Sequence, residues 1–306
     1  MKPLLSVCIP IYNRLPFLER QLDRMMDDKE LFKEQVQLII SDNCSSEDLK
    51  SCCEKYQSQG LQLLYHCNET NIGPDGNFAW CFHHADGKYV WLLGSDDILV
   101  KGVLEKIVSL LQDENYGLVA LSMKPKNEEV TTYYDHGEIL ADICYWITFM
   151  SVNIIRTETI KTIALSDFLS SFMIQVPAYL NACLASDVNV VLYLGYPFEK
   201  DSNAENNGGY NLFQVFIENL HGIYQSFVDK EMLSQKTFER IKRIEYKDFL
   251  VGFIVDFLIF RLPKRKNFDL DNSWGILWKH YGRYFYSYYY LARRIAVRIV
   301  RLLLRK

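Results

Sequence analysis

The sequence predicts an α/β protein with a mixed, mainly parallel sheet flanked by helices, followed by a helical C-terminal extension. Over residues 4–122, short apolar runs alternate with segments of helical spacing, which is the period of a doubly wound sheet. The apolar runs are continuous, as in strands that are covered on both faces. Beyond about residue 210, two long segments have the spacing of helices. We therefore expect one α/β domain over residues 1–210 and a helical region over residues 211–306.

The pattern is clearest in the first half of the α/β domain, residues 1–122. Its first apolar run ends at Pro10, and apolar residues then recur at helical spacing from Leu15 to Met26. The polar sequence 45–48 supplies an N-cap and first-turn acidic residues for a later helix. Residues 68–76 are dense in turn formers and predict a loop. Strands are expected at 4–10, 36–41, 61–65 and 89–93, and helices at 15–26, 77–85 and 104–111, with a further helix ending near residue 56.

The pattern weakens after residue 122. Ile154 and Ile155 predict one further strand, and Pro177 interrupts a mostly apolar stretch. No internal repeat or low-complexity linker is found. The interrupted apolar stretch covers residues 168–184, and another apolar run covers 189–195. Two helices are expected at 210–227 and 236–260. The final segment, 274–306, is aromatic and then rich in arginine.

Composition and charge exclude several classes of protein. The chain has 49% hydrophobic and 24% charged residues, which is typical of a globular protein. Its eight cysteines show no CxxC spacing, which argues against a zinc site or a disulfide framework and favours a reducing cytosol. The apolar run 4–11 is too short for a signal peptide, and no segment offers the ~20 uninterrupted apolar residues of a spanning helix. We expect a protein that is neither secreted nor transmembrane.

The net charge of −4 conceals an asymmetry along the chain. Residues 264–306 carry a net charge of +9, so that the rest of the chain carries −13. An acidic body with a basic tail indicates that the tail has an anionic partner of its own.

Two adjacent carboxylates, Asp96 and Asp97, follow the apolar run 88–93. Ligands of open α/β sheets bind beyond the carboxyl ends of the strands. Adjacent carboxylates repel each other and cost free energy unless a cation or a pKa shift compensates. Hard oxygen ligands of this type suit Mg²⁺ or Mn²⁺, often with phosphate oxygens completing the shell. The alternative is a solvated turn in which Asp97 caps a helix that begins near Val100.

Four polar motifs follow the expected strands in a recognisable order. They read VCIPIYN over 7–13, ISDNCSS over 40–46, NIG over 71–73, and ADGKYV running into GSDD over 85–97. With these motifs the chain resembles family 2 glycosyltransferases, which have the GT-A fold. Within that family it is most similar to bacterial enzymes that extend O-antigen or capsular polysaccharide, including the abequosyltransferase-like group. The resemblance covers residues 4–122 well and the later chain loosely.

The resemblance implies a GT-A catalytic domain over 1–210, with a nucleotide-sugar-binding half (1–122) and an acceptor-side half (123–210). The loop after the first strand would wrap the nucleoside, with Pro10 fixing φ and the ring of Tyr12 lying against the base. Asp42 would accept the imide N–H of uracil or thymine, which favours a UDP- or dTDP-sugar donor. The alternative is that Asp42 or Asn43 is only a turn residue, and a surface turn is equally open for residues 73–76. The implied donor contacts are Pro10, Tyr12, Asn13, Asp42, Asn71, Gly73, Asp75, Ser95, Asp96 and Asp97.

Asp96 matches the second aspartate of the family's DxD motif. The resemblance implies that Asp96, with Asp97 beside it, holds a divalent cation (Mn²⁺ or Mg²⁺) that stabilises the departing nucleoside diphosphate. Gly94 stands where the first aspartate is usual, which lowers the protein charge around the metal and puts strict metal dependence in doubt.

The catalytic base is harder to place. Inverting members of the family use a carboxylate, often in a Glu-Asp pair ahead of a helix, and residues 165–176 contain no such pair. Asp167 is the nearest acid and the first candidate, with Glu199 and Asp201 as rivals.

The C-terminal tail has the composition of a membrane-surface segment. Aromatic residues over 274–290 precede arginines that alternate with aliphatic residues up to 306. An amphipathic helix of this kind lies on an anionic membrane surface. That agrees with an acceptor carried on a polyprenyl diphosphate at the cytoplasmic face, so we expect a cytoplasmic protein that is peripheral on the inner face of the cell membrane. The alternative is a terminal helix whose aromatic residues pack on the catalytic domain.

Together these observations predict a metal-dependent, inverting glycosyltransferase. It would transfer a sugar from a nucleoside-diphosphate sugar to a lipid-linked oligosaccharide in the synthesis of O-antigen or capsule, with no nucleic-acid partner. Two alternatives stay open. A nucleotidyltransferase would normally show a Gly-rich basic loop after the first strand, and residues 10–14 are not one. A non-catalytic nucleotide-sugar-binding or scaffold protein is kept open by Gly94 and by the missing Glu-Asp pair.

Overall fold

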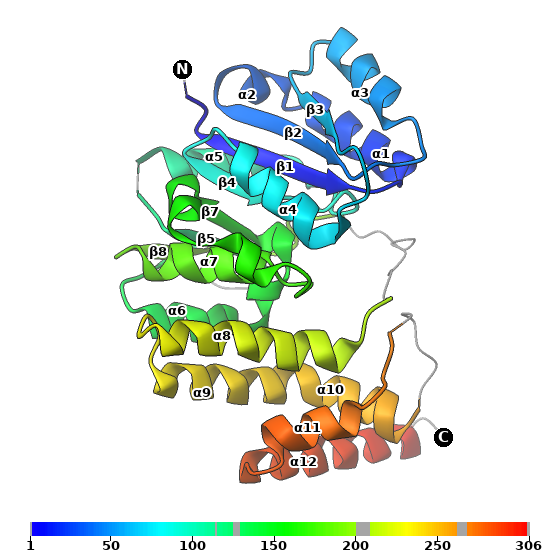
Figure 1. Cartoon of the computed structure of the whole chain (residues 1–306), viewed down its shortest axis with the longest axis vertical. Helices are drawn as coiled ribbons and strands as arrows, with labels where there is room; N and C mark the ends of the chain where they lie inside the picture. Colours follow the sequence, from blue (N-terminus) through cyan, green and yellow to red (C-terminus); the bar gives the residue numbers. More distant parts are fainter. Residues whose placement is uncertain (1, 114, 125–128, 200–208, 262–267, 305–306) are drawn as a thin grey trace. The chain divides into compact units, whose positions relative to one another are not determined.

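The structure is a computed structural model that describes residues 2–113, 115–124, 129–199, 209–261 and 268–304 (Figure 1). The chain forms two compact units, which are described separately. The first comprises residues 1–139 and 146–204, and the second comprises residues 140–145 and 205–306. Within the described ranges, every helix is too short or too polar to span a bilayer.

The first unit is built on a single mixed sheet. Its strands are β1 Leu5–Ile11, β2 Val36–Asp42, β3 Leu64–Cys67, β4 Tyr89–Leu92, β5 Leu118–Ser122, β6 Val130–Tyr133, β7 Asn153–Arg156 and β8 Asn189–Tyr193. In the described part of the chain, they pair in the order β3-β2-β1-β4-β7-β5-β8-β6. The strands β3, β2, β1 and β4 are mutually parallel, whereas β7 runs antiparallel between β4 and β5. The mixed, mainly parallel sheet that the sequence predicts is confirmed.

Helices cover both faces of this sheet. On one face, Leu18 of α1, Tyr56 of α3 and Ile107 of α5 join Val7 and Ile9 of β1 in one buried core. On the other face, α4 contacts β1, β2 and β4, and α7 contacts β5 and β7, so that both helices lie in front of the sheet in Figure 1. Burial on both faces explains why the strands read as continuous apolar runs. The helices are α1 Leu15–Met26, α2 Lys29–Glu34, α3 Leu49–Ser58, α4 Gly73–His84, α5 Val103–Asp113, α6 His136–Ile143 and α7 Gln175–Leu184, with 3₁₀ segments at Cys144–Thr148, Met150–Val152, Thr157–Thr162 and Leu165–Phe168.

The observed elements correct the sequence prediction in several places. The bounds of α1 are those predicted, but α4 begins at Gly73 and includes residues that were predicted as a loop. Pro74 explains this difference, because its fixed φ and missing N–H suit the first turn of a helix. The third strand begins at Leu64, three residues later than predicted. The elements α2, β5, β6 and α6 were not predicted.

The second unit is helical. A π-helical segment, Gln214–Asn219, continues into α8 (Leu220–Asp229). The long helix predicted over 236–260 is present as α9 (Gln235–Glu245), a π segment (Tyr246–Leu250), α10 (Val251–Phe253) and a second π segment (Ile254–Ile259). The predicted tail segment forms two helices, α11 (Ser273–Tyr281) and α12 (Phe285–Leu303). The buried core of this unit includes Phe213, Ile217, Tyr246, Leu250, Ile254, Ile276, Leu277 and Tyr281.

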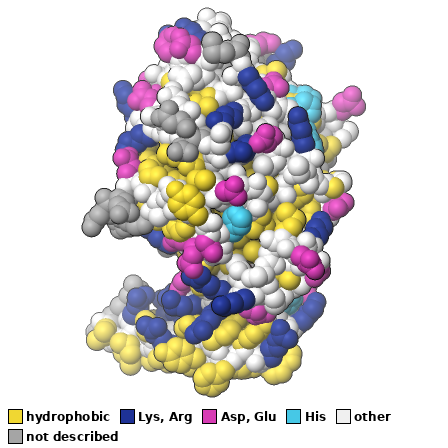
Figure 2. Space-filling model, turned by 90° about the vertical axis from the view of Figure 1, so that its left-hand side faces the viewer, with side chains coloured by type: hydrophobic (Ala, Val, Ile, Leu, Met, Phe, Trp, Pro, Cys, Tyr) yellow, Lys and Arg dark blue, Asp and Glu magenta, His cyan; other side chains and the backbone are white. Residues whose placement is uncertain are grey.

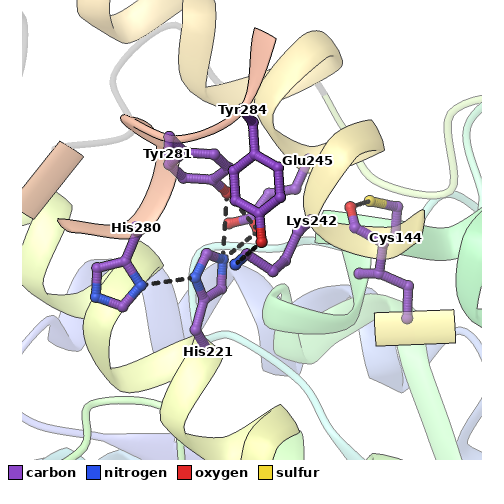
Figure 3. Close-up of polar contacts among 8 residues, drawn as sticks. Cys144, His221, Lys242, Glu245, His280, Tyr281 and Tyr284 are labelled. Atoms are coloured by element: carbon purple, nitrogen blue, oxygen red, sulfur yellow. Dashed lines mark hydrogen bonds and ion pairs between the residues drawn. The ribbon is translucent and has the colours of Figure 1, made fainter. Parts of the chain in front are cut away.

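A buried polar cluster joins α8, α9 and α11 within the second unit (Figure 3). Nε2 of His221 lies 2.9 Å from Oε2 of Glu245, and its Nδ1 lies 3.2 Å from Nδ1 of His280. The hydroxyl of Tyr281 also lies 3.2 Å from Nε2 of His221. Burial raises the pKa of Glu245 well above its usual value, and burial lowers the pKa of His221 to about 3 and that of His280 to about 4. Both histidines are therefore neutral at pH 7, and burial favours the protonated form of Glu245.

Candidate functional site

The carboxyl ends of three parallel strands meet at one edge of the sheet. The register pairs Ile11 of β1 with Asp42 of β2, and Cys8 of β1 with Leu92 of β4. The backbone N–H of Leu93 donates to the carbonyl of Cys8, and that of Asn43 donates to the carbonyl of Ile11. The polar segments after β1, β2 and β4 therefore leave the sheet side by side, as the sequence predicts for a ligand site.

The acidic pair lies in the segment after β4, and its two members have different environments. Asp96 is partly exposed, and its Oδ2 lies 3.3 Å from a guanidinium nitrogen of Arg14, which follows β1. Asp97 is directed inward, and its Oδ2 accepts a hydrogen bond of 2.5 Å from the hydroxyl of Ser151. That hydroxyl in turn accepts the backbone N–H of Gly94 at 2.8 Å. Asp96 thus pairs with Arg14, while Asp97 is held by Ser151.

Burial is the largest influence on Asp97, and it raises the pKa of this carboxyl to about 7. The neighbouring charge of Asp96 also raises the pKa, whereas the hydrogen bond from Ser151 and the charge of Arg14 lower it. A folded-state pKa above the unfolded value means that Asp97 stabilises the fold at low pH and that this contribution is lost as the pH rises through about 7.

Gly94 has a structural reason to lack a side chain. A Cβ at this position would lie 2.5 Å from Oδ2 of Asp97 and 3.2 Å from Oγ of Ser151. The hydrogen bonds that anchor Asp97 therefore occupy the space that an aspartate at position 94 would need. The observed position of Asp97 is therefore incompatible with the first aspartate of a DxD motif at position 94.

Asparagine side chains tie together the loops around this edge. The amide of Asn43 donates to Oδ1 of Asn71 at 2.9 Å and to the carbonyl of Gly73 at 3.2 Å. Its own Oδ1 accepts from Asn68 at 3.1 Å and from the backbone N–H of Ile72 at 3.0 Å. Asn71 and Gly73 were predicted donor contacts, and this network holds both of them. Asn68 was missed, because a buried asparagine at the end of a strand has no distinctive pattern in a single sequence.

The loop after β1 is held in a strained form by the loop after β2. Asn13 and Arg14 both have positive φ, of 57° and 65°. The N–H of Asn13 donates to Oγ of Ser45 at 2.7 Å, and its Oδ1 accepts the N–H of Ser46 at 3.0 Å. Such strain persists only where surrounding contacts over-determine it, and it is frequent at ligand sites. The ring of Tyr12 remains half exposed beside this turn.

Asp42 is more enclosed than the sequence indicates. Its side chain is buried, with Oδ1 accepting the N–H of Ser45 at 2.8 Å and Oδ2 accepting the hydroxyl of Tyr65 at 2.6 Å. Burial and the bond to Asp42 raise the pKa of Tyr65. Each carboxylate oxygen has a second lone pair, so that Asp42 retains the capacity to accept from a ligand. Its predicted contact with a base stays a prediction.

Asp75 binds the backbone of the segment that precedes α7. It lies in the first turn of α4, is 6% exposed, and accepts the N–H of Phe172 at 2.8 Å and of Ile174 at 3.3 Å. Burial raises the pKa of this carboxyl, while these backbone bonds lower it. Asp75 therefore shapes the segment that leads into α7, and its predicted place near the nucleoside or sugar stays a prediction.

The three candidate bases differ in what the structure describes of them. Asp167 lies exposed in the 3₁₀ segment Leu165–Phe168. Glu199 is linked to the acidic segment, because its N–H donates to the carbonyl of Ile98 at 2.8 Å and its Oε2 lies 3.7 Å from Arg20. Asp201 lies outside the described residues. The backbone contact with Ile98 places Glu199, the predicted rival, next to the acidic pair.

Asp96 and Asp97 are the predicted ligands of a divalent cation. No group of three or more His, Cys, Asp or Glu side chains that could hold a metal ion occurs within the described ranges. The oxygens of Asp96 fit a hard cation that takes most of its ligands from phosphate and water. The ion pair with Arg14 shows that the site already attracts a positive charge.

Comparison with known proteins identifies the family. The family model described as "Glycosyl transferase family 2" matches residues 6–175, more than half of the chain. The fold and the strand-edge site define a glycosyltransferase of the GT-A class, and the chain belongs to glycosyltransferase family 2. The family and fold that the motifs predict are confirmed.

Individual relatives include two bacterial proteins with named glycosyltransferase activities. An abequosyltransferase of Salmonella typhimurium is 34% identical over 112 residues, which cover 36% of this chain and 33% of that protein. A β-1,3-glucosyltransferase of Campylobacter jejuni, named for a lipid-linked GalNAc(5)-diNAcBac-PP-undecaprenol substrate, is 34% identical over 116 residues, or 38% of this chain and 36% of that protein. The chain thus matches about a third of the length of each of these relatives.

Solved structures share the fold. TarS of Staphylococcus aureus superimposes with a TM-score of 0.61 and 19% identity, covering 83% of this chain and 74% of that one. A complex of the same protein with UDP-GlcNAc gives a TM-score of 0.58 at 19% identity, covering 83% of this chain and 73% of that one. A mannosyltransferase of Pyrobaculum calidifontis with GDP-Man and Mn²⁺ gives 0.52 at 15% identity, covering 80% and 69%. At these identities the likeness establishes the fold alone.

Proposed function

We propose that the chain is an inverting glycosyltransferase that uses a nucleoside-diphosphate sugar to extend a lipid-linked saccharide in bacterial surface-polysaccharide synthesis. The observation that carries this proposal is the reachable carboxylate of Asp96, held beside Arg14 at the carboxyl edge of a family 2 domain. The named activities of the bacterial relatives support the class of reaction and the lipid-linked acceptor.

In this proposal the loops after β1 and β2 hold the donor's nucleoside. The half-exposed ring of Tyr12 stacks on the base, and Asp42 accepts its imide N–H, which favours a UDP- or dTDP-sugar. The Asn43 network fixes residues 71–73 so that backbone N–H groups can face phosphate oxygens. These contacts orient the anomeric carbon toward the acceptor.

Asp96 is the residue of this chain that would hold the divalent cation, with Asp97 behind it. When bound, the cation neutralises charge on the departing diphosphate. Arg14 adds a fixed positive charge at the same place and shares this task. Because Asp97 is anchored by Ser151, its role is to fix the position of the 94–97 segment.

The reaction itself requires a carboxylate to take one proton. The acceptor hydroxyl attacks the anomeric carbon on the face opposite the diphosphate, the bond from that carbon to the diphosphate oxygen breaks, and the oxygen keeps the electron pair. The proton of the attacking hydroxyl passes to the base. Asp167 remains the first candidate, and the contact of Glu199 with Ile98 makes it the stronger rival.

The proposal is tested by donor turnover in a single pair of variants. Asp96→Asn should lower transfer and donor hydrolysis by at least about a hundredfold, as expected when the cation that stabilises the leaving diphosphate loses its carboxylate ligand. Asp86→Asn is the matched control, because Asp86 is exposed and precedes β4 at its opposite end. Full activity of Asp96→Asn would refute the assignment, and a wild-type chain that binds the donor without turnover would favour a non-catalytic binding protein.

We also propose that α11 and α12 rest on an anionic membrane surface. Figure 2 shows hydrophobic side chains along the lowest part of the molecule, where Figure 1 places these helices, with Lys and Arg side chains directly above them. Trp278 is 71% exposed, Phe285 84% and Leu303 66%. Such apolar exposure beside the arginines of α12 fits an interfacial helix. The localisation that follows is cytoplasmic, on the inner face of the cell membrane.

Vesicle binding tests this membrane contact. The double variant Phe285→Gln/Leu303→Gln should bind anionic vesicles roughly tenfold more weakly or worse, since each exposed apolar side chain contributes when it is buried. The control is Leu64→Gln/Tyr134→Gln, which alters two exposed apolar residues of the first unit. Equal loss in both double variants would show that the effect is not specific to α12.

A further inference from the structure

An open pocket of about 560 Å³ lies within the second unit. It is lined by Glu239, Arg240 and Arg243 of α9 and by Arg283, Tyr284 and Tyr286, which lie where α11 gives way to α12. Three guanidinium groups and one carboxylate therefore share a single cavity. Neither the donor site nor the proposed sugar transfer uses these residues.

Aromatic rings hold two of the guanidinium groups in place. Arg283 lies 4.9 Å from the ring centroid of Tyr284, and Arg243 lies 5.6 Å from that of Tyr286. Arg243 also donates to the hydroxyl of Tyr290 at 3.5 Å. Arg283 likewise donates one Nη2 hydrogen bond to the hydroxyl of Tyr284 at 2.7 Å. A guanidinium carries five N–H donors, so each of these two keeps donors for the oxygens of a ligand, and fixing it beforehand lowers the entropic cost of binding.

The single carboxylate of the pocket is already compensated. Glu239 accepts the hydroxyl of Tyr284 at 2.7 Å, and Arg283 lies 3.8 Å from its Oε1. The ammonium of Lys242 lies behind Tyr284, 3.5 Å from the same hydroxyl. Arg243, Arg283 and Lys242 thus surround this one carboxylate, so that the pocket favours an anion that can bond to more than one guanidinium.

A second, smaller pocket of about 100 Å³ adjoins the same connection between α11 and α12. It is lined chiefly by aromatic and aliphatic side chains, among them Trp274, Trp278, Tyr288 and Leu291. Residues 283, 284 and 286 line the cationic pocket, whereas residues 281, 282, 287 and 288 line the apolar one. One short segment thus separates a site for an anion from a site for an alkyl or isoprenoid chain.

We propose that the pocket of Arg240, Arg243 and Arg283 binds the terminal phosphate of a membrane lipid whose apolar chain enters the neighbouring aromatic pocket. The ligand class is a lipid phosphomonoester or diphosphate, because a terminal phosphate offers more charge and more free oxygens to several guanidinium groups than a diester does. The inference rests on the proposed membrane contact of α11 and α12, and it adds to that contact a specific headgroup site.

Vesicle flotation of the full chain tests this inference. One set of phosphatidylcholine vesicles carries phosphatidic acid, and the other carries phosphatidylglycerol adjusted to the same surface potential. The wild-type chain should prefer phosphatidic acid by about tenfold. Arg243→Gln/Arg283→Gln should lose that preference while still binding phosphatidylglycerol. Both side chains are exposed, so that these substitutions leave the core intact.

The matched control is Arg293→Gln/Arg301→Gln, which removes two exposed cations of α12 outside the pocket. It should weaken binding to both vesicle types and keep the preference. Equal binding of the wild-type chain to both vesicle types, or a preference that survives in Arg243→Gln/Arg283→Gln, would overturn the headgroup site alone. Absence of binding to any anionic vesicle would refute the membrane contact itself. Inorganic diphosphate that stabilises the wild-type chain against heat as strongly as short-chain phosphatidic acid, but not Arg243→Gln/Arg283→Gln, would assign the pocket to a soluble phosphate and overturn the lipid assignment.

Discussion

At the scale of single residues, the site depends on how differently two neighbouring aspartates are placed. Asp96 is partly exposed and lies beside Arg14, whereas Asp97 is half-buried and accepts a hydrogen bond from Ser151. Two adjacent carboxylates would otherwise repel each other at close range. Here burial raises the pKa of Asp97 to about 7, so that near neutrality it is ionised only in part. The motif therefore presents the carboxylate of Asp96, and not that of Asp97, to the donor.

Gly94 gives a prediction at this scale. Gly94→Ala should destabilise the fold by about 1–3 kcal/mol and lower turnover, because the new Cβ would displace Asp97 or Ser151. Gly94→Asp, which restores the family's usual motif, should for the same reason fail to tighten Mn²⁺ dependence. Thermal melts and Mn²⁺ titrations of donor hydrolysis measure both effects.

Gly222→Ala is the matched control, because a Cβ at position 222 of α8 would meet nothing within 4 Å. It should be neutral or slightly stabilising, by up to about 1 kcal/mol. A Gly94→Asp variant that gains Mn²⁺ affinity with unchanged stability would contradict the steric account.

At the scale of elements, Asp75 connects α4 to the segment that leads into α7. Two backbone N–H groups, of Phe172 and Ile174, converge on its carboxylate, and Ser170 and Phe172 have positive φ. The segment before α7, in which a catalytic acid was predicted, is thus shaped by a residue of α4.

Asp75→Asn should loosen this segment selectively. An amide in place of the carboxylate points an NH₂ group at one of the two N–H donors, and an unsatisfied buried group costs about 1–3 kcal/mol. We expect faster proteolysis within residues 169–174 and a lower melting temperature, with donor affinity little changed. Asp187→Asn, an exposed acid after α7, is the control. A large loss of donor affinity without a change in proteolysis would instead place Asp75 at the nucleoside or sugar.

The buried cluster of α8, α9 and α11 gives a prediction about pH. The folded-state pKa of Glu245 is raised, so its contribution to stability is present below the unfolded pKa and is lost as the pH rises through the folded value. The pKa of His221 is lowered to about 3, so its contribution is present above the unfolded value and is lost as the pH falls. The charges that face this pair come from Lys242 and Glu239.

Glu245→Gln isolates the first of these effects, since glutamine keeps a donor toward His221 and cannot ionise. Its melting temperature relative to the wild type should therefore be higher at about pH 8 than at about pH 5, given an unfolded glutamate pKa near 4.3. A difference that does not change with pH would show that Glu245 titrates as it does in the unfolded chain. Thermal melts of both proteins across this range provide the measurement.

The bounds of a helix could be predicted from the sequence where the spacing of apolar residues and the residues at the helix ends indicate the same helix. The bounds of α1 follow from clean helical spacing, whereas α4 was predicted to start too late because Gly73 and Pro74 resemble a loop. Site candidates with a distinctive motif, such as Asp96, could be found from the order of the motifs. Contacts between distant residues could not be predicted, because no local pattern signals them. The bonds between Ser151 and Gly94 and between Asp75 and Phe172 are of this kind.

At the scale of the whole molecule, charge and chemistry are divided along the chain. The acidic majority of the sequence includes the family 2 domain, and the basic C-terminal segment carries the aromatic helices. A donor in solution and an acceptor on a lipid would require such a division, because the enzyme must take one substrate from water and the other from a membrane surface. The proposed function therefore uses both parts of the chain.

Crystals of the chain with a nucleoside-diphosphate sugar and Mn²⁺ test the central claim most directly, through anomalous scattering from manganese. We predict one strong anomalous peak within about 2.3 Å of an Asp96 oxygen, a distance typical of a hard cation on a carboxylate, with diphosphate oxygens completing the shell. Asp96→Asn crystals should lose the peak. An ordered donor at the edge of β1, β2 and β4 without manganese at Asp96, or a donor bound elsewhere, would contradict the account.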